Sequence, residues 1–390
     1  MLIAFDAKRA VQNNTGLGNY SRYVVDILCR YYPDGQYRLF APRRKENPQL
    51  RNLLDRNGER VDMVYPSGAW RRFPSLWRTF GIPFELEARG IRIFHGLSNE
   101  LPLDIRKAKG IRSVVTLHDL IFRRMPECYH AADRMIYDYK YRRSCELADV
   151  VVAVSECTKR DAMELWGIPE EKIKVVYQGC DESFKQDCTA AKKREVRERY
   201  HLPAHYILSV GSIERRKNVL AVVKAFRLLL ADASRRALPL PRDLAVVLVG
   251  RQTPYTDEIR AYIRKEGLDG RVHILSGVTF PDLPAVYRLA DVFVYPSRYE
   301  GFGIPILEAL NSSVPVIAAT GSCLEEAGGP DSLYVAPDDI SALATALLDV
   351  LTVPQLRTSM VEKGKLYAAR FSEHFQADRL MEIYRGLSGE

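Results

Sequence analysis

Short apolar runs alternate with stretches of helical periodicity along the whole chain of 390 residues. The apolar runs predict strands near 2–5, 91–94, 113–117, 150–154, 206–210, 244–249, 272–275 and 291–295. Between them apolar residues recur at helical spacing, as at Tyr20, Tyr23, Val24, Ile27 and Leu28. Strands that alternate with helices in this way predict parallel sheets covered by helices on both faces.

The length of the chain predicts two domains, since a domain usually holds about 100–200 residues. A polar stretch, 185–199, shows no apolar period before Val196, so we interpret it as a linker with a short helix. The predicted domains are therefore 1–185 and 186–371. The closing segment, 372–390, is predicted to be a helix with Ala377, Leu380, Met381 and Tyr384 on one face.

The stretch 291–311 is the most informative part of the sequence. An apolar strand runs into a loop of Pro, Ser and Gly, and a helix is predicted to begin near Gly303 and end near Asn311. Unpaired amides at the start of a helix favour an anion such as a diphosphate. Glycines on both sides of Phe302 allow the backbone to approach a ligand. Glu300 in the loop and Glu308 on the helix can hold two different hydroxyl-bearing parts of that ligand.

Other loops with candidate chemistry also follow predicted strands. Gly211 to Asn218 combines a strand-end glycine, the cations Arg216 and Lys217 and the start of a helix, which again favours an anion. His95, and the pair His118 and Asp119, lie just past strand ends, where ligands bind in open α/β sheets.

The polar segment 12–20 is predicted to be a loop, and its glycines, Gly16 and Gly18, predict either a tight turn or a phosphate loop.

The run Pro-Ser-x-x-Glu-Gly-Phe-Gly-x-Pro-x-x-Glu-Ala at 296–309 resembles the Glu-x7-Glu signature of the retaining glycosyltransferases of family 4. The runs 114–120 and 167–181 resemble the same family. The resemblance implies an α/β protein with the GT-B fold, in which two Rossmann-like, doubly wound domains face each other across a cleft. The first domain would bind the acceptor and the second the nucleotide sugar, and the last helix would cross back to the first domain.

The resemblance also implies roles for single residues. Glu300, His118 and Lys217 are the expected catalytic residues: Glu300 would hold hydroxyls of the transferred sugar, His118 would point to the sugar or acceptor, and Lys217 would contact the diphosphate. Glu308 would hold the ribose. The other expected donor-binding residues are Gly16, Gly18, Arg216, Val278, Thr279, Gly301, Phe302, Gly303 and Ile304. The expected acceptor-binding residues are Asn19, His95 and Asp119.

The sequence departs from the family at two places. Ser212 stands where many members have an arginine, so part of the phosphate clamp must come from Arg216, from backbone amides or from elsewhere. Ser312 and Ser313 stand where relatives usually have a small residue and a glycine.

No Asp-x-Asp pair follows a predicted strand, and Asp338 with Asp339 is better interpreted as a helix cap. We therefore expect no metal and no cofactor. The expected reaction is a front-face substitution in which Lys217, Arg216 and backbone amides stabilise the leaving diphosphate, and the donor phosphate takes the acceptor proton.

The run Glu214 to Asn218 resembles the branch of the family that builds bacterial surface polysaccharides, often from GDP-mannose. GDP-mannose is therefore the favoured donor, and UDP-sugars stay open. The expected acceptor is a saccharide or a lipid-linked saccharide at the inner face of the membrane. Two alternatives remain, a GT-B nucleotide-sugar epimerase and a non-catalytic subunit or sensor that binds a nucleotide sugar. The sequence does not determine the donor, the acceptor, the linkage or the oligomeric state.

The composition, with 47% apolar and 27% charged residues, is typical of a soluble globular protein, and the formal charge is +8. The first 187 residues hold 31 Lys and Arg against 25 Asp and Glu, and the remainder holds 26 against 24. A basic first half suits nucleic acid, anionic lipid, an anionic acceptor or plain solvation; the resemblance implies no nucleic acid.

Segment 42–92 is rich in arginine and contains Trp70 and Trp77. Its stretch 75–88 is predicted to be an amphipathic helix, interrupted near Gly81 to Pro83. Such a helix either contacts an anionic membrane or packs on its own sheet with arginines at the rim.

Seven cysteines occur singly, without Cys-x-x-Cys spacing, which predicts a reducing cytosol and neither disulfides nor zinc. The apolar run at the N-terminus is too short for a signal peptide, and no stretch approaches the roughly 20 apolar residues of a membrane helix. The predicted location is the cytoplasm, with peripheral membrane contact as a hypothesis.

Overall fold

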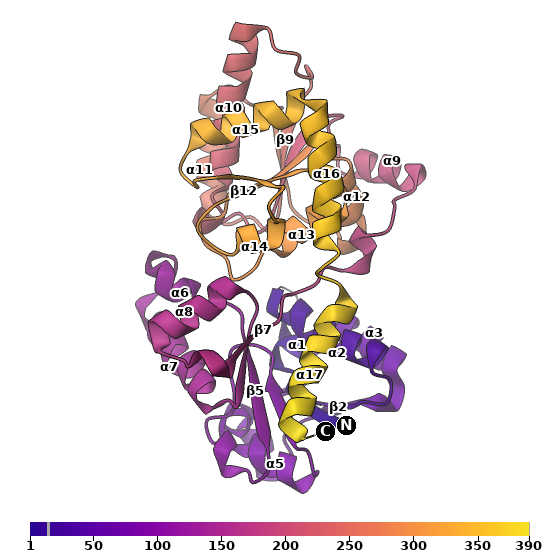
Figure 1. Ribbon diagram of the computed structural model, residues 1–390, viewed down its shortest axis with the longest axis vertical. Coiled ribbons are helices and arrows are strands. Elements are labelled where there is room, and N and C mark those ends of the chain that lie inside the picture. The colour runs from indigo at the N-terminus through magenta and orange to yellow at the C-terminus, as the bar shows by residue number, and fades with distance from the viewer. Residues whose placement is uncertain (14–15, 390) are drawn as a thin grey trace. The chain divides into compact units, whose positions relative to one another are not determined.

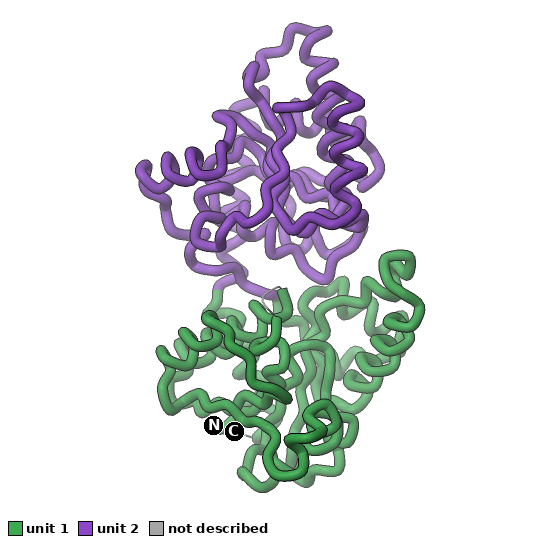
Figure 2. Tube along the Cα trace, turned by 180° about the vertical axis from the view of Figure 1, so that it is seen from behind, with its two compact units in different colours: residues 1–177, 373–390 green, residues 178–372 purple. Residues whose placement is uncertain are grey.

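The computed structural model describes residues 1–13 and 16–389. The chain divides into two compact units (Figure 2). Unit 1 comprises Met1–Tyr177 with Glu373–Glu390, and unit 2 comprises Gln178–Ser372. Each unit is built around a parallel sheet (Figure 1).

The sheet of unit 1 has seven strands in the order β3-β2-β1-β4-β5-β6-β7. Their bounds are β1 Leu2–Asp6, β2 Gln36–Phe40, β3 Val61–Val64, β4 Ile93–Gly96, β5 Arg112–Leu117, β6 Val150–Ala153 and β7 Ile173–Val175. Every neighbouring pair is parallel. The order reverses between β1 and β4, and ligands of doubly wound sheets bind outside the carboxyl ends of the strands at such a point.

Helices cover both faces of this sheet. One face packs against α1 (Lys8–Gln12), α2 (Gly16–Tyr31), α3 (Pro48–Asn57) and α17 (Glu373–Ser388). The other packs against η3 (Trp77–Gly81), which the short α4 (Pro74–Leu76) precedes, and against α5 (Ile82–Ala88), η4 (Ile105–Lys107), α7 (Ala131–Leu147) and α8 (Glu156–Trp166). Short connecting helices are η1 (Gly58–Arg60), η2 (Gly68–Arg72), α6 (Ile121–Arg124), η5 (Pro126–Cys128) and η6 (Glu170–Lys172).

The last helix, α17, belongs to unit 1, as predicted. Its buried apolar residues include the predicted Ala377, Leu380, Met381 and Tyr384, and they lie in the same apolar cluster as residues of α2 and β1. Asp378 also accepts a hydrogen bond from the hydroxyl of Tyr32 on α2 at 2.7 Å. The C-terminal segment is therefore an integral part of the first unit.

The sheet of unit 2 has six parallel strands in the order β10-β9-β8-β11-β12-β13. Their bounds are β8 Tyr206–Val210, β9 Ala245–Val249, β10 Val272–Leu275, β11 Val292–Tyr295, β12 Val316–Ala319 and β13 Leu333–Val335. The helices are α9 Ala190–Arg199, α10 Val219–Arg236, α11 Tyr255–Lys265, α12 Leu283–Arg288, α13 Ile304–Asn311, α14 Leu324–Gly328, α15 Ile340–Thr352 and α16 Pro354–Ala368, with the short η7 Glu182–Phe184, η8 Arg215–Lys217 and η9 Phe280–Asp282. Here the order reverses between β8 and β11.

The boundary between the units lies after Tyr177, a few residues before the predicted boundary after residue 185. The reason is η7, which packs on unit 2. The ring of Phe184 contacts the rings of Tyr287 and Phe280, and its carbonyl accepts a hydrogen bond from Arg288 at 2.8 Å. The predicted linker is thus already part of the second unit.

The prediction that 12–20 forms one loop is wrong where the structure describes it, since α2 begins at Gly16. Gly18 lies in the first turn of that helix, and a Cβ there would sit 1.9 Å from the carbonyl oxygen of Asn13. This glycine therefore allows α2 to pack closely against the end of α1. Asn14 and Thr15 of the predicted loop lie outside the described residues.

The amphipathic stretch 75–88 is helical but contains a π turn, η3, just before Pro83. Trp77 and Arg78, on which the prediction of membrane contact partly depended, both point inward. Trp77 is fully buried and stacks on Phe40, and Arg78 pairs with Asp6 and Glu100. Both residues hold the helix on its own sheet.

The structure pairs none of the seven cysteines in a disulfide. No single helix among the described residues is long and apolar enough to span a membrane. The helical segments Ile340–Thr352 and Pro354–Ser388, which meet at an angle of 96°, are together long and apolar enough by length and composition alone.

Candidate functional site

Two loops of unit 2 meet where the strand order reverses. One follows β8 and contains η8, and the other follows β11 and leads into α13. The amide of Arg298 donates to the carbonyl of Arg216 at 2.9 Å, and the guanidinium of Arg216 donates to the carbonyl of Tyr299 at 2.6 Å. These bonds fix the two loops to each other, so the residues on them form one site.

Glu300 is the centre of this site. Its Oε1 lies 2.8 Å from Lys217 Nζ and 2.8 Å from Arg216 Nη1. The same oxygen accepts hydrogen bonds from Ser297 Oγ at 2.7 Å and from Tyr295 OH at 3.0 Å. The second oxygen, Oε2, takes part in none of these four contacts.

The pKa values of Glu300 and Lys217 are shifted by burial and by their charged neighbours. Burial by itself would raise the pKa of Glu300, but Lys217 and Arg216 outweigh it and hold the pKa at about 2. Burial would likewise lower the pKa of Lys217, but the carboxylate of Glu300 raises it above its ordinary value. The site therefore holds a carboxylate and two cations at neutral pH. Lys217 uses two of its three N–H groups on Tyr295 and Glu300 in the described contacts, so one is left for an anion.

Helix α13 begins where predicted, with Gly303 at its N-cap and Ile304 as its first residue. No side chain caps this end. Pro305 has no N–H and the amide of Ile306 donates to the carbonyl of Gly303 at 2.9 Å, so the amides of Gly303 and Ile304, with the positive end of the helix dipole, are the groups that face an anion. A Cβ on Gly303 would lie 2.7 Å from the Cβ of Ala327, so this glycine is required by the packing of α14. Phe302 is buried and contacts the ring of Phe371.

Glu308 lies one turn further along α13 and is partly buried. Its Oε2 accepts a hydrogen bond of 2.7 Å from the hydroxyl of Tyr287 on α12. Burial raises the pKa of Glu308 to about 7, Tyr287 opposes this rise, and the nearby charge of Asp181 adds to it. The two acids of the motif thus differ: Glu300 is fully ionised at neutral pH and Glu308 about half ionised.

Val278 and Thr279 follow β10, which is an outermost strand of the sheet in unit 2. They therefore lie past the carboxyl end of a strand, as the two loops above do, but at the side of the sheet. The hydroxyl of Thr279 donates to Asp282, and its amide donates to the hydroxyl of Tyr200 at 3.2 Å. The backbone of Thr279 therefore already has partners, which leaves Val278 as the better candidate of the two for contact with a nucleotide base.

In unit 1 the predicted His118 follows β5. Its ring is buried, lies edge-on to the ring of Tyr20, and its Nε2 is 2.9 Å from the carbonyl of Leu97. Because a carbonyl only accepts, Nε2 carries the proton and Nδ1 is the acceptor nitrogen. Burial lowers the pKa of His118 to about 4, so the ring is neutral. A neutral imidazole suits hydrogen bonding to a hydroxyl.

His95, predicted to bind the acceptor, is fully buried at the end of β4. Its ring nitrogens lie 2.6 Å from the hydroxyl of Tyr384 and 2.8 Å from that of Thr116. The structure thus uses His95 to join α17 to the sheet, and its side chain exposes no atom to an acceptor.

The other predicted residues of unit 1 lie near the carboxyl edge. Gly16 and Asn19 are exposed on the first turn of α2, and the amide oxygen of Asn19 accepts from Arg22 at 2.7 Å. Asp119 is half-buried and accepts a hydrogen bond from the amide of Ile121, the first residue of α6, at 3.1 Å.

Several residues of these sites escaped the sequence analysis. In unit 2 they are Tyr295 and Ser297, which donate to Glu300, and Tyr287, which donates to Glu308. In unit 1 Arg78 pairs with Asp6 at the end of β1 and with Glu100 after β4, so a buried charge cluster lies at the point where that strand order reverses. Only Asp6 and Ser297 carried a signal in the sequence, since each lies within two residues past the end of a predicted strand.

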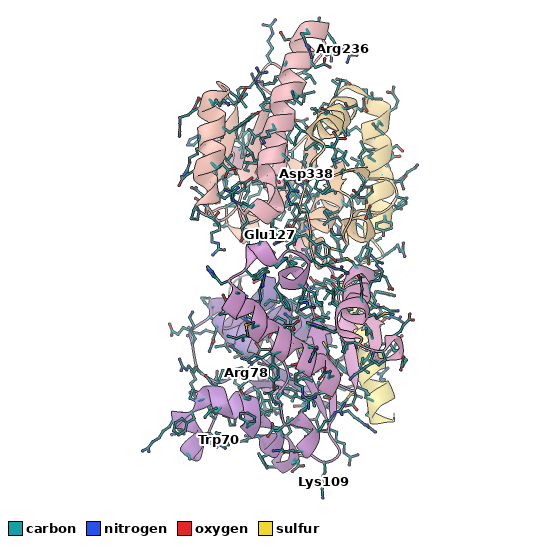
Figure 3. The ribbon with its side chains drawn as sticks, turned by 90° about the vertical axis from the view of Figure 1, so that its left-hand side faces the viewer. Trp70, Arg78, Lys109, Glu127, Arg236 and Asp338 are labelled. Atoms are coloured by element: carbon teal, nitrogen blue, oxygen red, sulfur yellow. The ribbon has the colours of Figure 1, made fainter. Side chains whose placement is uncertain are left out.

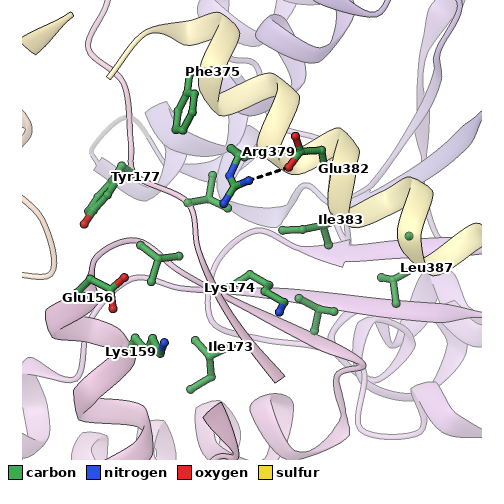
Figure 4. Close-up of a pocket in the computed structure, with 14 residues that line it drawn as sticks. Glu156, Lys159, Ile173, Lys174, Tyr177, Phe375, Arg379, Glu382, Ile383 and Leu387 are labelled. Atoms are coloured by element: carbon green, nitrogen blue, oxygen red, sulfur yellow. Dashed lines mark hydrogen bonds and ion pairs between the residues drawn. The ribbon is translucent and has the colours of Figure 1, made fainter. Parts of the chain in front are cut away.

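Two further features lie apart from these residues. In the described part of the chain, no group of three or more His, Cys, Asp or Glu side chains is arranged to hold a metal ion. A groove of about 750 Å³ in unit 1 lies between α17, α8 and the edge strand β7 (Figure 4). None of the predicted site residues lines it.

Each of the two units matches a known protein family. Residues 21–184 match the family model described as Glycosyltransferase Family 4, and residues 192–367 match the model described as Glycosyl transferases group 1. The chain is similar to O-antigen chain mannosyltransferase B of Escherichia coli, with 29% identity over 368 residues and 92% of each chain covered. It is also similar to the serotype-specific mannosyltransferase WbdA of E. coli, with 28% identity over 265 residues, which is 67% of this chain and 32% of that longer protein.

Among solved structures, that of Anabaena Alr3699/HepE in complex with UDP-glucose matches with a TM-score of 0.74 and 16% identity, covering 99% of each chain. A likeness at this identity concerns the fold, and it confirms the predicted GT-B class of two parallel α/β sheets.

Proposed function

We propose that this chain transfers mannose from GDP-mannose to a saccharide or lipid-linked saccharide. The chain belongs to the glycosyltransferases of family 4, and within that family it is similar to O-antigen mannosyltransferases. The transfer retains the anomeric configuration, needs no metal and serves the synthesis of a surface polysaccharide. The observation that carries the proposal is the cluster of Lys217, Arg216 and Glu300 beside the uncapped start of α13.

In the proposed reaction the diphosphate of the donor binds to the free N–H of Lys217, to Arg216 and to the first amides of α13. These groups stabilise the negative charge that develops on the leaving diphosphate. Since they supply fixed positive charge, the chemistry has no need of a cation from solution. Oε2 of Glu300 holds hydroxyls of the sugar, and Glu308 holds the ribose.

No residue of unit 1 is proposed as a general base, because the pKa of His118 is lowered to about 4 by burial and its ring is a hydrogen-bond acceptor fixed by Leu97. His118 instead orients a hydroxyl of the sugar or acceptor, and the donor phosphate takes the acceptor proton. Retention follows because leaving group and nucleophile use the same face of the sugar.

The preference for GDP-mannose is supported by the mannosyltransferase relatives and by the sequence of the loop after β8. The enzyme is proposed to work in the cytoplasm at the inner face of the membrane, where it meets its lipid-linked acceptor by peripheral contact. The basic first half of the chain supports contact with an anionic surface.

The test is acceptor-dependent release of nucleoside diphosphate from labelled GDP-mannose, with UDP-glucose as the competing donor and a polyprenyl-diphosphate saccharide as acceptor. Glu300→Gln should abolish transfer, and Glu362→Gln, a change at an exposed acid of α16, should leave it intact. A chelator should not reduce the rate, and the product should keep the anomeric configuration of the donor.

The alternatives give different outcomes. Turnover of the sugar without acceptor indicates an epimerase, and donor binding without turnover indicates a non-catalytic subunit. Preference for the UDP-sugar overturns the donor assignment alone, while an inverted product overturns the mechanism.

A further inference from the structure

The exposed large apolar side chains of this protein are unevenly distributed. Among the described residues there are twelve, and seven of them lie on two helical segments of unit 1: Phe73, Leu76, Phe80, Phe84, Met135, Ile136 and Tyr139. Single exposed apolar residues need no explanation, but a group on one side of a molecule indicates a surface that is covered in use. We refer to these seven residues as the apolar face.

The two segments cover the same side of the sheet. Leu76, Phe80 and Phe84 belong to the run α4-η3-α5, Phe73 directly precedes it, and the other three belong to α7. The inward residues of both runs, such as Trp77, Leu86 and Cys145, lie in one buried cluster. Glu100 joins them further, since it pairs with Arg78 of η3 and lies 4.0 Å from Lys140 of α7.

The spacing of Leu76, Phe80 and Phe84 places them on one side of the helical run. They are four positions apart, which keeps side chains on one face of a helix, and Phe73 lies just before the run as the N-cap of α4. The opposite face carries the buried Trp77, Ile82 and Leu86. Phe84 is 61% exposed and Met135 74% exposed, so these side chains extend into solvent and do not pack on neighbouring elements.

The charge around the first segment favours an anionic partner. Between positions 71 and 112 the chain has nine Lys and Arg against four Asp and Glu. The acids are engaged: Glu85 pairs with Arg89, Glu87 accepts from the amide of Lys109, Glu100 pairs with Arg78, and Asp104 is buried. Within the part of the chain that the structure describes, the exposed cations Arg71, Arg72, Arg92, Lys107 and Lys109 have no acidic partner. Figure 3 shows Trp70, next to two of them, and Lys109 toward the end of unit 1 that lies away from Glu127.

We propose that the apolar face, with the cations that flank it, is the surface by which this protein docks on a bilayer containing anionic lipid. Apolar side chains on the outer side of a helix enter the boundary of headgroups and acyl chains, and flanking arginines and lysines pair with lipid phosphates. The proposal deepens the proposed function and rests on it for its purpose, which is to bring the enzyme to a lipid-linked acceptor.

The test is sedimentation of the full chain with vesicles of phosphatidylcholine alone and of an equimolar mixture with phosphatidylglycerol. The wild type should sediment with the mixed vesicles, less with phosphatidylcholine, and less at high salt. Phe80→Ser/Phe84→Ser should lower the partition coefficient by roughly tenfold or more, because two large apolar contacts are lost. Met135→Ser/Tyr139→Ser should lower it as well, and Arg71→Ala/Arg72→Ala should reduce the dependence on salt.

The matched control is Leu228→Ser/Leu366→Ser, which removes two exposed apolar side chains from unit 2 and should bind as the wild type does. All variants change exposed residues, so their melting temperatures serve as the check on folding. Wild-type protein that stays in solution with the mixed vesicles, or a control that loses as much binding as the variants of the apolar face, overturns the proposal. A wild-type dimer that Phe80→Ser/Phe84→Ser dissociates, without any effect of lipid, assigns the face to a second copy of the chain instead.

The same samples separate this proposal from the proposed function. The rise in melting temperature on addition of GDP reports the donor site of unit 2, which none of these substitutions touches. Vesicle binding without a response to GDP removes the donor assignment and leaves the docking surface, and the reverse result removes the docking surface alone.

Discussion

The hydrogen bond between Tyr287 and Glu308 gives the sharpest test of the donor site. Tyr287→Phe removes only the hydroxyl that donates to Glu308 Oε2 at 2.7 Å and keeps the buried ring. The carboxylate has a pKa of about 7, raised by burial and held down in part by this hydrogen bond. If the ionised carboxylate accepts the ribose hydroxyls, as proposed, its pKa controls the affinity for the nucleotide.

The expected size follows from the strength of the bond. A hydrogen bond to a charged group contributes about 1.5–3 kcal/mol, and one pKa unit corresponds to about 1.4 kcal/mol, so the pKa of Glu308 should rise by about 1–2 units. At pH 7 the ionised fraction should then fall from about one half to roughly 1–10%. The dissociation constant at pH 7 should accordingly rise about 5–50-fold, and the loss should disappear at pH values above the new pKa.

The assay is calorimetric titration with GDP, or with UDP if the wild type binds it better, over a range from pH 6 to above pH 9. Tyr334→Phe is the matched control, because it removes a tyrosine hydroxyl bonded to the carbonyl of Gly329 in the same unit. The affinity of the wild type should fall as the pH falls through about 7, and the profile of Tyr287→Phe should be displaced to higher pH. Coincident profiles for the two proteins would refute the role of Glu308 as an ionised ribose ligand.

Three further results are expected. Glu308→Gln should stabilise the ligand-free protein by up to about 3 kcal/mol above pH 7. The raised pKa of Glu308 means that the folded state penalises the ionised carboxylate, and glutamine removes this cost. The gain in stability should vanish below the unfolded pKa near 4.5, and thermal unfolding at several pH values measures it. Ser313→Gly should raise the free energy of unfolding by about 0.5–1 kcal/mol, because Ser313 has φ of 61° and glycine adopts this conformation without strain. Ser312→Gly is the control and should bring no gain, since Ser312 has φ of −83°. Denaturant titration compares the two variants. Glu300→Gln should bind GDP roughly tenfold more tightly than the wild type while it loses transfer, since both cations are then released to the diphosphate; weaker binding by calorimetry would contradict the proposed exchange of partners.

Much of the fold could be predicted because the alternation of strands and helices is continuous. The exceptions have local causes. Gly16 and Gly18 predict a loop, since glycine disfavours helix, yet Gly18 lies in α2 because only a residue without Cβ fits against Asn13. The position of the boundary near Tyr177 depended on where Phe184 packs, which is a property of unit 2 that no pattern in the segment itself reveals.

The sequence named Lys217, Arg216 and Glu300 as candidates, but not the contacts that join them. Lys217 and Glu300 are 83 positions apart, and only the strand order of unit 2 brings their loops together. Tyr295 ended a predicted strand and Ser297 stood in the quoted motif, and neither had an assigned role, since the role depends on which way each side chain points. The same limit applies to Trp77 and Arg78: the amphipathic pattern was visible, and the assignment of its inner and outer faces required the structure.

The geometry around Glu300 explains why the site can be stable without a ligand and still bind one. A buried carboxylate is costly unless it is paired, and here Lys217 and Arg216 pair with it. These are also the cations proposed for the diphosphate. In the proposed complex the diphosphate competes with Glu300 for the same two cations, so binding of the donor costs the carboxylate part of its pairing. On this proposal Glu300 should weaken the binding of the nucleotide while its contact with the sugar promotes the transfer, as expected of a residue that acts in the transfer and not in the affinity.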